Sequence, residues 1–269
     1  IKRTPGALEL LNLCCFLDPE SIPLDLVQQI SAVGAQHAAP LQSVVADELT
    51  LDDALGALRR YSLIQRKDSS FTLHRLVSAV AREQMGGERQ KLWLSVVISL
   101  LEESYQFDEY DFSTWENSRS LISHNQVAAR FAQKYGVESE KVVWLLNQTA
   151  EYLWHNGFYK EAFQCVNDAN EICGKHLADE HPYTAESINN LGYLLRAMGD
   201  LSGARPFCER ALSIRETILG PDHPDTATSL NNLGALLRAM GDLTRARPFY
   251  ERTLAIRETI LGPDHPDTA

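Results

Sequence analysis

The sequence predicts a mainly α-helical protein in two parts: a small helical domain with a β-hairpin, followed by an α-α superhelix of repeats. Three observations support this prediction. The chain repeats itself with a period of 42 residues, each repeat has the apolar spacing of two helices, and residues 63–74 alternate between apolar and polar. A length of 269 residues, 44% of them hydrophobic, is enough to bury a core in each part.

The repetition is strongest in the last third of the chain. Residues 182–223 and 224–265 are identical at 33 of 42 positions. A further shift by one period places residues 140–181 on the same pattern with weaker similarity, and Asn147, Gly157 and Ala162 fall at matching positions. We therefore expect repeats at 140–181, 182–223 and 224–265, with a further repeat interrupted at the end of the chain.

Each repeat has the pattern of a helix, a turn and a second helix. Gly241 can adopt the left-handed conformation that ends a helix, and Asp242 offers an acceptor to the N–H groups that open the next one. Gly192 and Gly234 stand where two antiparallel helices must approach closely. A single pair of helices cannot bury both apolar faces, so neighbouring repeats are expected to stack as a solenoid.

The spacing of Gly234, Ala246, Tyr250 and Thr253 resembles that of tetratricopeptide repeats. The 42-residue period, with NNLG, ALSIRE and LGPDHPDT, is similar to the longer variant found in kinesin light chains and bacterial signalling proteins. This resemblance implies a right-handed superhelix whose first helices line a concave groove that binds peptides or proteins. The implied groove residues are Asn147, Glu151, Trp154, His155, Asn189, Tyr193, Arg196, Asn231, Ala235 and Arg238.

The asparagines and arginines of this set suggest how a ligand is held. The amides of Asn189 and Asn231 can pair with an extended peptide backbone, and the guanidinium groups of Arg196 and Arg238 match a carboxylate. The alternative is that Asn189 and Asn190 only tie one helix to the next.

Known catalytic motifs are absent from the sequence. It lacks GxxxxGK[ST], GxGxxG, HExxH and GxSxG, so these residues alone are not expected to form an enzyme. His181, His223 and His265 recur at one per repeat, but positions one repeat apart lie on the order of 10 Å apart, too far to share a metal ion.

We interpret LGPDHPDT as the joint between repeats, where Gly220 ends one helix and Pro224 lies near the start of the next.

Residues 1–86 follow a different pattern. Short helices are expected over 8–17 and 24–30, and a third over LDDALGALRRYSL with Thr50 as its N-cap. Residues 63–66 and 71–74 predict a hairpin, and a helix is expected from Arg75 to Met85. Three helices followed by a hairpin are the plan of a winged-helix domain.

The stretches LDPESIP, ALRRYSLIQR and FTLHRLVSAVARE resemble the winged-helix domain of the STAND NTPases, signal-transduction ATPases with an NB-ARC-type core. Leu73-His74-Arg75 stands in place of their Met-His-Asp signature, which implies that His74 senses the β-phosphate of ADP. Arg75 departs from the usual Asp. The alternative is a histidine that ends a strand and bonds to the backbone. Cofactors are not expected within residues 1–269, because ADP or ATP and Mg²⁺ would bind a separate nucleotide-binding domain.

Charge and composition exclude several other classes. The net charge of −11 disfavours nucleic acid as a partner, and residues 1–86 carry 8 Lys/Arg against 10 Asp/Glu. No apolar stretch approaches the ~18 residues that a membrane span requires. Five cysteines without a CxxC motif indicate reduced thiols in a cytoplasmic protein.

Residues 87–139 are predicted to form a helical region that links the two parts and caps the solenoid. KLWLSVVISLLEESY is expected to be helical, residues 115–135 to form a further pair of helices, and FDEYDF to be a loop.

Together these features predict part of a STAND NTPase, cut from a longer chain. The repeats would bind a protein or peptide trigger, the winged helix would relay nucleotide state to its own NB-ARC domain, and the full-length protein would oligomerise on activation. The alternative is an adaptor or a transcriptional regulator without a nucleotide switch.

Overall fold

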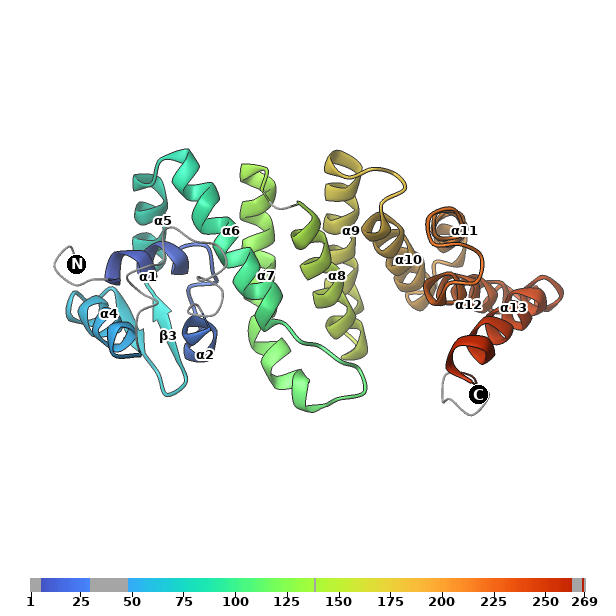
Figure 1. Cartoon of the computed structure of the whole chain (residues 1–269), viewed down its shortest axis with the longest axis horizontal. Coiled ribbons are helices and arrows are strands. Elements are labelled where there is room, and N and C mark those ends of the chain that lie inside the picture. Colours follow the sequence, from blue (N-terminus) through green and yellow to red (C-terminus); the bar gives the residue numbers. More distant parts are fainter. Residues whose placement is uncertain (1–5, 30–47, 138, 263–267, 269) are drawn as a thin grey trace. The chain divides into compact units, whose positions relative to one another are not determined.

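The computed structural model describes residues 6–29, 48–137, 139–262 and 268. The chain divides into two compact units, Ile1–Leu145 and Leu146–Ala269, here called the N-terminal and C-terminal units. The division falls within helix α8 (Ser139–His155). Figure 1 shows the elements along the chain, and each unit is described by itself.

The N-terminal unit combines helices with one small antiparallel sheet. Its strands pair in the order β1-β3-β2, with Ile22 opposite Phe71 and Ile64 opposite Leu73. These four apolar side chains are buried. Its elements are α1 (Ala7–Cys14), β1 (Ile22–Pro23), α2 (Leu24–Gln28), α4 (Glu48–Arg60), β2 (Ile64–Arg66), β3 (Ser70–Leu73), α5 (Arg75–Gln84), α6 (Gly87–Ser104) and α7 (Ser113–Tyr135).

The predicted hairpin is confirmed by the pairing of β2 with β3. Strand β1 was not predicted, because two residues are too few to show alternation and one of them is Pro23. Proline cannot donate to a ladder, so it is tolerated at the edge of the sheet where β1 lies.

Two helix predictions were wrong. Thr50 is not an N-cap, because α4 already begins at Glu48 and places Thr50 in its first turn. Residues 115–135 lie in one continuous helix, α7 (Ser113–Tyr135, 23 residues), instead of a pair. The segment holds no Gly or Pro to interrupt it, and it ends only at Gly136, whose φ of 65° is left-handed.

The core of the N-terminal unit forms around α1. This helix packs against α4, α5 and α6, and α6 also packs against α7. The largest fully buried side chains of the unit include Phe16, Phe71 and Trp93. The edge-to-face contact of Phe16 with Phe131, at 5.6 Å between ring centroids, joins the end of α1 to α7.

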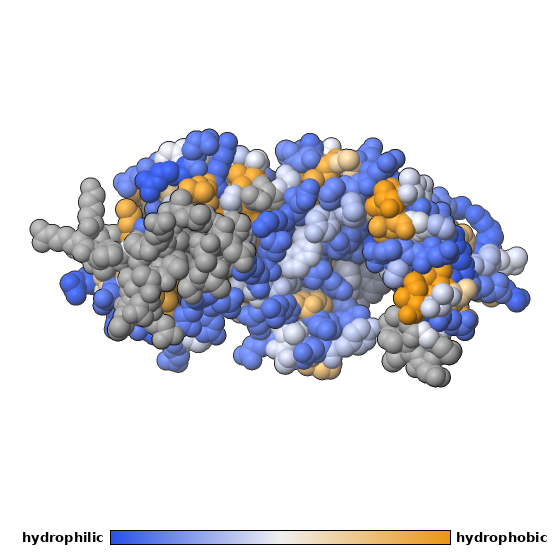
Figure 2. Space-filling model, viewed as in Figure 1, coloured by the Kyte–Doolittle hydropathy of each residue, from blue (hydrophilic) through white to orange (hydrophobic). Residues whose placement is uncertain are grey.

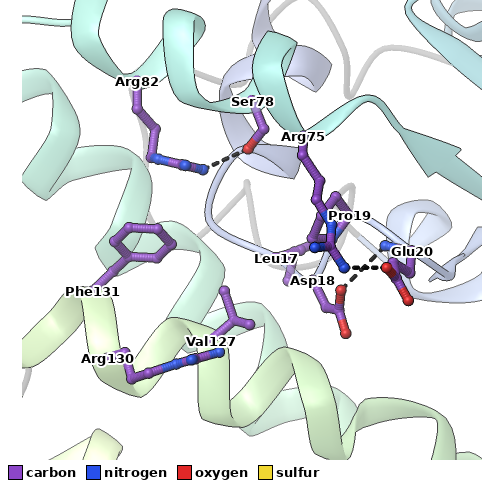
Figure 3. Close-up of a pocket in the computed structure, with 10 residues that line it drawn as sticks. All are labelled: Leu17, Asp18, Pro19, Glu20, Arg75, Ser78, Arg82, Val127, Arg130 and Phe131. Atoms are coloured by element: carbon purple, nitrogen blue, oxygen red, sulfur yellow. Dashed lines mark hydrogen bonds and ion pairs between the residues drawn. The ribbon is translucent and has the colours of Figure 1, made fainter.

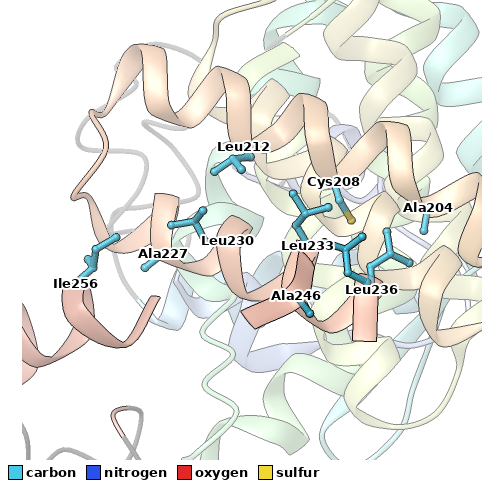
Figure 4. Packing of buried hydrophobic residues seen from close by; sticks show 10 residues of the cluster. Ala204, Cys208, Leu212, Ala227, Leu230, Leu233, Leu236, Ala246 and Ile256 are labelled. Atoms are coloured by element: carbon cyan, nitrogen blue, oxygen red, sulfur yellow. The ribbon is translucent and has the colours of Figure 1, made fainter. Parts of the chain in front are cut away.

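In the C-terminal unit, successive helices pack against each other along the chain. These helices are α9 (Tyr159–His176), α10 (Pro182–Ala197), α11 (Leu201–Ile218), α12 (Pro224–Ala239) and α13 (Leu243–Leu261). The buried cluster shown in Figure 4 joins α11, α12 and α13. Because the side chains of α12 in this cluster contact helices of two repeats, stacking buries both faces, as the solenoid prediction requires.

The close approach of paired helices depends on glycine. A Cβ built on Gly192 would lie 2.7 Å from Sγ and 3.2 Å from the backbone N of Cys208, and one on Gly234 would lie 3.3 Å from the Tyr250 ring. The turns also follow the prediction: Gly241 has a φ of 85°, and Asp242 accepts a hydrogen bond from the N–H of Arg245.

The segment LGPDHPDT forms the joint between the second and third repeats. Gly220 has a φ of 93°, Pro224 is the first residue of α12, and His223 is its N-cap, with Nδ1 accepting from the N–H of Asp225 at 3.1 Å. The hydroxyl of the buried Thr226 donates to the carbonyl of Gly220 at 2.8 Å. The histidine of this phrase is therefore a helix cap. His265, in its second copy, lies outside the described residues.

The face seen in Figure 2 is mainly hydrophilic, and its hydrophobic colours are confined to separate patches. Within the described residues, none of the helices combines the length and the apolar character needed to cross a membrane.

Candidate functional site

The candidate site lies on the first helices of the repeats, α8, α10 and α12. Two of its predicted asparagines are buried and already bonded to the next repeat. Asn147 Nδ2 donates to Ser187 Oγ at 3.0 Å. Asn189 Oδ1 accepts from Ser229 Oγ at 3.2 Å and from Asn232 Nδ2 at 3.1 Å. In this structure both amides have the tying role that the sequence left open as the alternative for Asn189.

The serines that bond to these asparagines were not predicted, although their constant spacing from the asparagines could have indicated them. Ser187 lies 40 residues after Asn147, and Ser229 lies 40 residues after Asn189. Asn231, one residue before Asn232, is partly exposed.

Trp154, Tyr193 and Arg196 form a cluster at the ends of α8 and α10. The Trp154 and Tyr193 ring centroids are 5.1 Å apart with an interplanar angle of 43°, and Arg196 Cζ lies 5.2 Å from the centroid of the Tyr193 ring. All three side chains are half-buried. The structure thus brings together three predicted groove residues as two aromatic rings and a cation, a combination that favours stacking and cation–π contact.

The guanidinium of Arg196 is only partly satisfied. Its Nε is buried and has no hydrogen-bond partner among the described residues. The charge lies close to Cys208: burial raises the pKa of this thiol to about 11, and Arg196 acts against that rise. A buried donor without a partner costs about 1–3 kcal/mol.

The remaining predicted residues surround this cluster unevenly. Glu151 is half-buried, and the exposed His155 has its ring centroid 5.9 Å from that of Trp154. Arg238, one period after Arg196, is exposed. Ala235 replaces Tyr193 in the third repeat, so the aromatic platform is not repeated beside Arg238. This replacement is one of only nine differences between the two repeats. Because only the second repeat has an aromatic ring beside its arginine, it is the better place for an anchor.

His74 lies in the N-terminal unit, directly after β3. It is exposed and is the N-cap of α5, where its Nδ1 accepts from the N–H of Leu76 at 3.3 Å. His181 and His223 cap α10 and α12 in the same way. The structure therefore places His74 in the backbone-bonded position that was the alternative to a phosphate sensor, while its ring stays accessible. The described residues contain no group of three or more His, Cys, Asp or Glu side chains arranged to hold a metal ion.

Comparison with known proteins defines the class of the C-terminal unit. The family described as Tetratricopeptide repeat matches residues 141–207, 184–259 and 230–269. The chain therefore carries tetratricopeptide repeats, as the sequence predicted. A second family, a domain of unknown function (DUF7779), matches residues 2–90. A search of curated proteins found no significant match.

Two solved structures are similar to this chain. BtubC (BKLC) from P. vanneervenii is 20% identical over 90% of this chain and 94% of its own, with a TM-score of 0.52. A kinesin-light-chain-like protein with nearly identical TPR-like repeats, from Podosopora anserina, is 17% identical over 87% and 98% of the two chains, with a TM-score of 0.47.

A STAND protein with a tetratricopeptide repeat sensor, from Pyrococcus horikoshii, is also similar. It is 12% identical over 99% of this chain and 47% of its own, with a TM-score of 0.41. At these identities the likeness concerns the fold, which is a mainly helical one with tetratricopeptide repeats.

Proposed function

We propose that the repeats bind a protein or peptide through the exposed side of α8, α10 and α12, with Trp154, Tyr193 and Arg196 as the anchor. Tetratricopeptide repeats mediate protein–protein interaction in general, and residues 141–269 match that family. The observation that carries the anchor is the half-buried cluster of two aromatic rings in contact and a guanidinium beside one of them.

The chemistry of the anchor defines the ligand. A carboxylate can accept two hydrogen bonds from a guanidinium, and these bonds are stronger than those between neutral groups. Aromatic residues and arginine are also the side chains most often found at the energetic centre of interfaces. We therefore propose a ligand segment that presents an acidic group to Arg196 and an apolar group to Trp154. Asn231 and Arg238 extend this surface, whereas Asn147 and Asn189 support it from within.

A peptide display library selected on the full chain tests the proposal. Trp154→Ala and Arg196→Gln are each expected to weaken a selected peptide about tenfold or more, as the loss of a charge-assisted hydrogen bond or a buried ring implies. Arg247→Gln is the matched control. This side chain is 80% exposed and belongs to α13, the second helix of the third repeat, so it lies outside the proposed binding surface on the first helices. Unchanged affinity in Trp154→Ala, Arg196→Gln and Arg238→Ala would refute the anchor.

We also propose that residues 1–86 of the N-terminal unit are a winged-helix relay of a cytoplasmic STAND NTPase. Its element order, with helices, a hairpin and a following helix, supports this proposal together with the sequence resemblance at His74. In that setting the accessible ring of His74 would contact ADP held by a nucleotide-binding domain of the longer protein, which would supply any ATPase activity and oligomerise when the repeats are occupied.

This relay is tested in the longer protein. His74→Ala is expected to speed the release of ADP, and His181→Ala, which removes the equivalent helix cap in the repeats, is expected to leave it unchanged. An unaltered ADP off-rate in His74→Ala would instead favour the alternative of an adaptor or transcriptional regulator without a nucleotide switch. A GxxxxGK[ST] motif before Ile1 would decide between the two classes.

A further inference from the structure

A cavity of about 450 Å³ lies within the N-terminal unit, and none of the predicted site residues lines it. It is bounded by α5, by α7 and by the segment that follows α1 (Figure 3). The residues that line it are Leu17, Asp18, Pro19, Glu20, Arg75, Ser78, Arg82, Val127, Arg130 and Phe131. They come from three separate segments of the sequence, residues 17–20, 75–82 and 127–131.

Three arginines face this cavity, and two of them lack an acidic partner. Arg75 forms an ion pair with Glu20. Among the described residues, neither Arg82 nor Arg130 forms an ion pair with a carboxylate. Asp18, the second acid of the lining, accepts from the N–H of Glu20 at 3.2 Å. The lining therefore carries one more positive than negative charge, in a chain whose net charge is −11.

Arg82 is held in place before any ligand arrives. Its Nη1 donates to the carbonyl of Cys15 and to Ser78 Oγ, and its Cζ lies 4.6 Å from the centroid of the Phe131 ring. Fixing the guanidinium in advance reduces the conformational entropy that binding would otherwise cost. Arg130 is exposed and comes from α7, on the opposite side of the cavity from Arg82 (Figure 3).

Part of the lining is apolar. Leu17, Val127 and Phe131 provide a wall beside the two arginines. The volume lies within the range of about 300–1,000 Å³ that small-molecule sites occupy, and such sites combine apolar walls with a few charged groups. The cavity thus has room for an oxyanion together with the organic group that carries it.

We propose that this cavity binds a small organic oxyanion, a phosphate or carboxylate attached to an apolar or aromatic group. Arg82 and Arg130 donate to the oxyanion from opposite sides, and the wall of Leu17, Val127 and Phe131 contacts the organic part. The site is built by this chain alone and His74 does not line it, so it depends neither on peptide binding by the repeats nor on a nucleotide relay.

Isothermal titration of the full chain with phenyl phosphate, benzoate, inorganic phosphate and phenol tests this proposal. We expect phenyl phosphate or benzoate to bind more tightly than both inorganic phosphate and phenol. Whichever of the two aromatic anions binds more tightly shows whether the site prefers a phosphate or a carboxylate. Arg130→Gln is expected to weaken this binding about tenfold or more, which corresponds to the loss of one charge-assisted hydrogen bond. Arg130 is exposed and makes no contact that the fold requires, so this variant should fold normally.

Arg119→Gln is the matched control. Arg119 is an exposed arginine of the same helix that does not line the cavity, and its replacement is expected to leave the affinity unchanged. Three results would overturn the proposal: no binding of either aromatic anion at millimolar concentration, equal weakening by Arg119→Gln, or full affinity in Arg130→Gln. Arg82→Gln serves only as a second variant, because Arg82 also supports the backbone at Cys15.

Discussion

The N–H of Asp18 donates a hydrogen bond of 3.0 Å to Nδ1 of His124, and Nε2 of the same ring lies 3.1 Å from the carbonyl oxygen of Ser21. His124 is buried in α7, so one imidazole fastens this helix to the segment between α1 and β1. Because Nδ1 accepts, the ring proton belongs on Nε2, where it can donate to Ser21. The neutral ring satisfies both partners, whereas a protonated ring would direct a second N–H at the N–H of Asp18.

Acid is therefore expected to loosen the N-terminal unit. Burial lowers the pKa of His124, against the opposing effects of the Ser21 carbonyl and of Asp18. A depressed histidine pKa means that the unfolded chain binds the proton first. The stability from this ring is present above the unfolded pKa of about 6.5 and is lost as the pH falls from there through the folded pKa. The protection of the α7 amides against hydrogen exchange, relative to their intrinsic exchange rates, should therefore decrease as the pH is lowered from 7.5 to 5.5.

A variant separates this effect from general acid sensitivity. His124→Gln removes the titrating group, and we expect it to cost about 1–3 kcal/mol at neutral pH through unsatisfied polar groups. Its α7 amides should then show a smaller acid-induced change than those of the wild type. An equal acid response in the two proteins would show that His124 is not the group responsible.

The second prediction concerns the close contact of α10 with α11. Gly192→Ala would place a Cβ 2.7 Å from Sγ and 3.2 Å from the backbone N of Cys208. Because the backbone atom cannot move without shifting α11, we expect a loss of about 1–3 kcal/mol in the free energy of unfolding of the C-terminal unit, as overpacked cores show. Urea denaturation followed by circular dichroism measures it.

Gly174→Ala is the matched control for that substitution. Gly174 lies within α9, and a Cβ there would meet nothing within 4 Å. Alanine in an open helical position stabilises by about 0.5–1 kcal/mol relative to glycine. The two Gly→Ala variants should therefore change stability in opposite directions. A loss of stability in both would mean that Gly192 has no special steric role.

Much of the repeat fold could be predicted because its determinants are local and repeated. Gly241 and Asp242 predict a turn, because glycine can adopt the left-handed conformation that ends a helix and aspartate can cap the next one. The structure confirms both roles. The period of 42 residues was enough to predict which helices of the repeats are equivalent, and no information on contacts between residues was needed. The small β1 strand carried no such signal, since Ile22 and Pro23 become a strand only by pairing with β3.

The candidate site was harder to predict from sequence. The resemblance to tetratricopeptide repeats identified Trp154, Tyr193 and Arg196 as residues of one surface, but not that their side chains contact one another. It also placed Asn147 and Asn189 on that surface, whereas their amides are buried against the next repeat. Whether a polar side chain faces a ligand or a neighbouring helix depends on packing between repeats, which a spacing pattern does not contain.

The third prediction concerns the histidine of LGPDHPDT. His223→Ala removes the side chain that accepts from the N–H of Asp225 at the start of α12, and we expect it to cost about 1 kcal/mol, as the loss of an N-cap does. His223→Asn keeps an acceptor at the N-cap and should retain most of the stability. Thermal unfolding of the three proteins distinguishes a cap from a ligand contact, because only a cap predicts that asparagine rescues the fold.

The fourth prediction concerns Asn189 as a joint between repeats. Asn189→Ala leaves Ser229 and Asn232 without the acceptor that they share, so we expect a loss of about 1–3 kcal/mol. Hydrogen exchange should show the loss in α10 and α12 even when no peptide is present. Asn231→Ala, at the neighbouring and partly exposed position, should have a smaller effect on stability. Equal effects would contradict a tying role specific to Asn189.

The last prediction concerns Glu186 in α10. Burial raises the pKa of its carboxyl to about 7, the nearby Arg215 acts against the rise, and Asp225 adds to it. Arg215 Nη1 donates to the carbonyl of Asp225 at 2.9 Å and to Ser229 Oγ at 3.0 Å. The carboxyl is therefore held in its protonated form to a higher pH than in the unfolded chain.

A raised carboxyl pKa makes the folded state bind the proton more tightly than the unfolded state does. Stability from Glu186 is therefore fully present below the unfolded pKa of about 4.3 and is lost as the pH rises through about 7. Glu186→Gln cannot ionise, so at pH 8 we expect the C-terminal unit of this variant to be more stable than the wild type, on the order of 1 kcal/mol after allowance for partial exposure. The exposed Glu180, in the loop before α10, provides the control. Urea denaturation at pH 5 and pH 8 should show a gain at pH 8 for Glu186→Gln and none for Glu180→Gln, and equal gains in both would indicate a general effect of net charge.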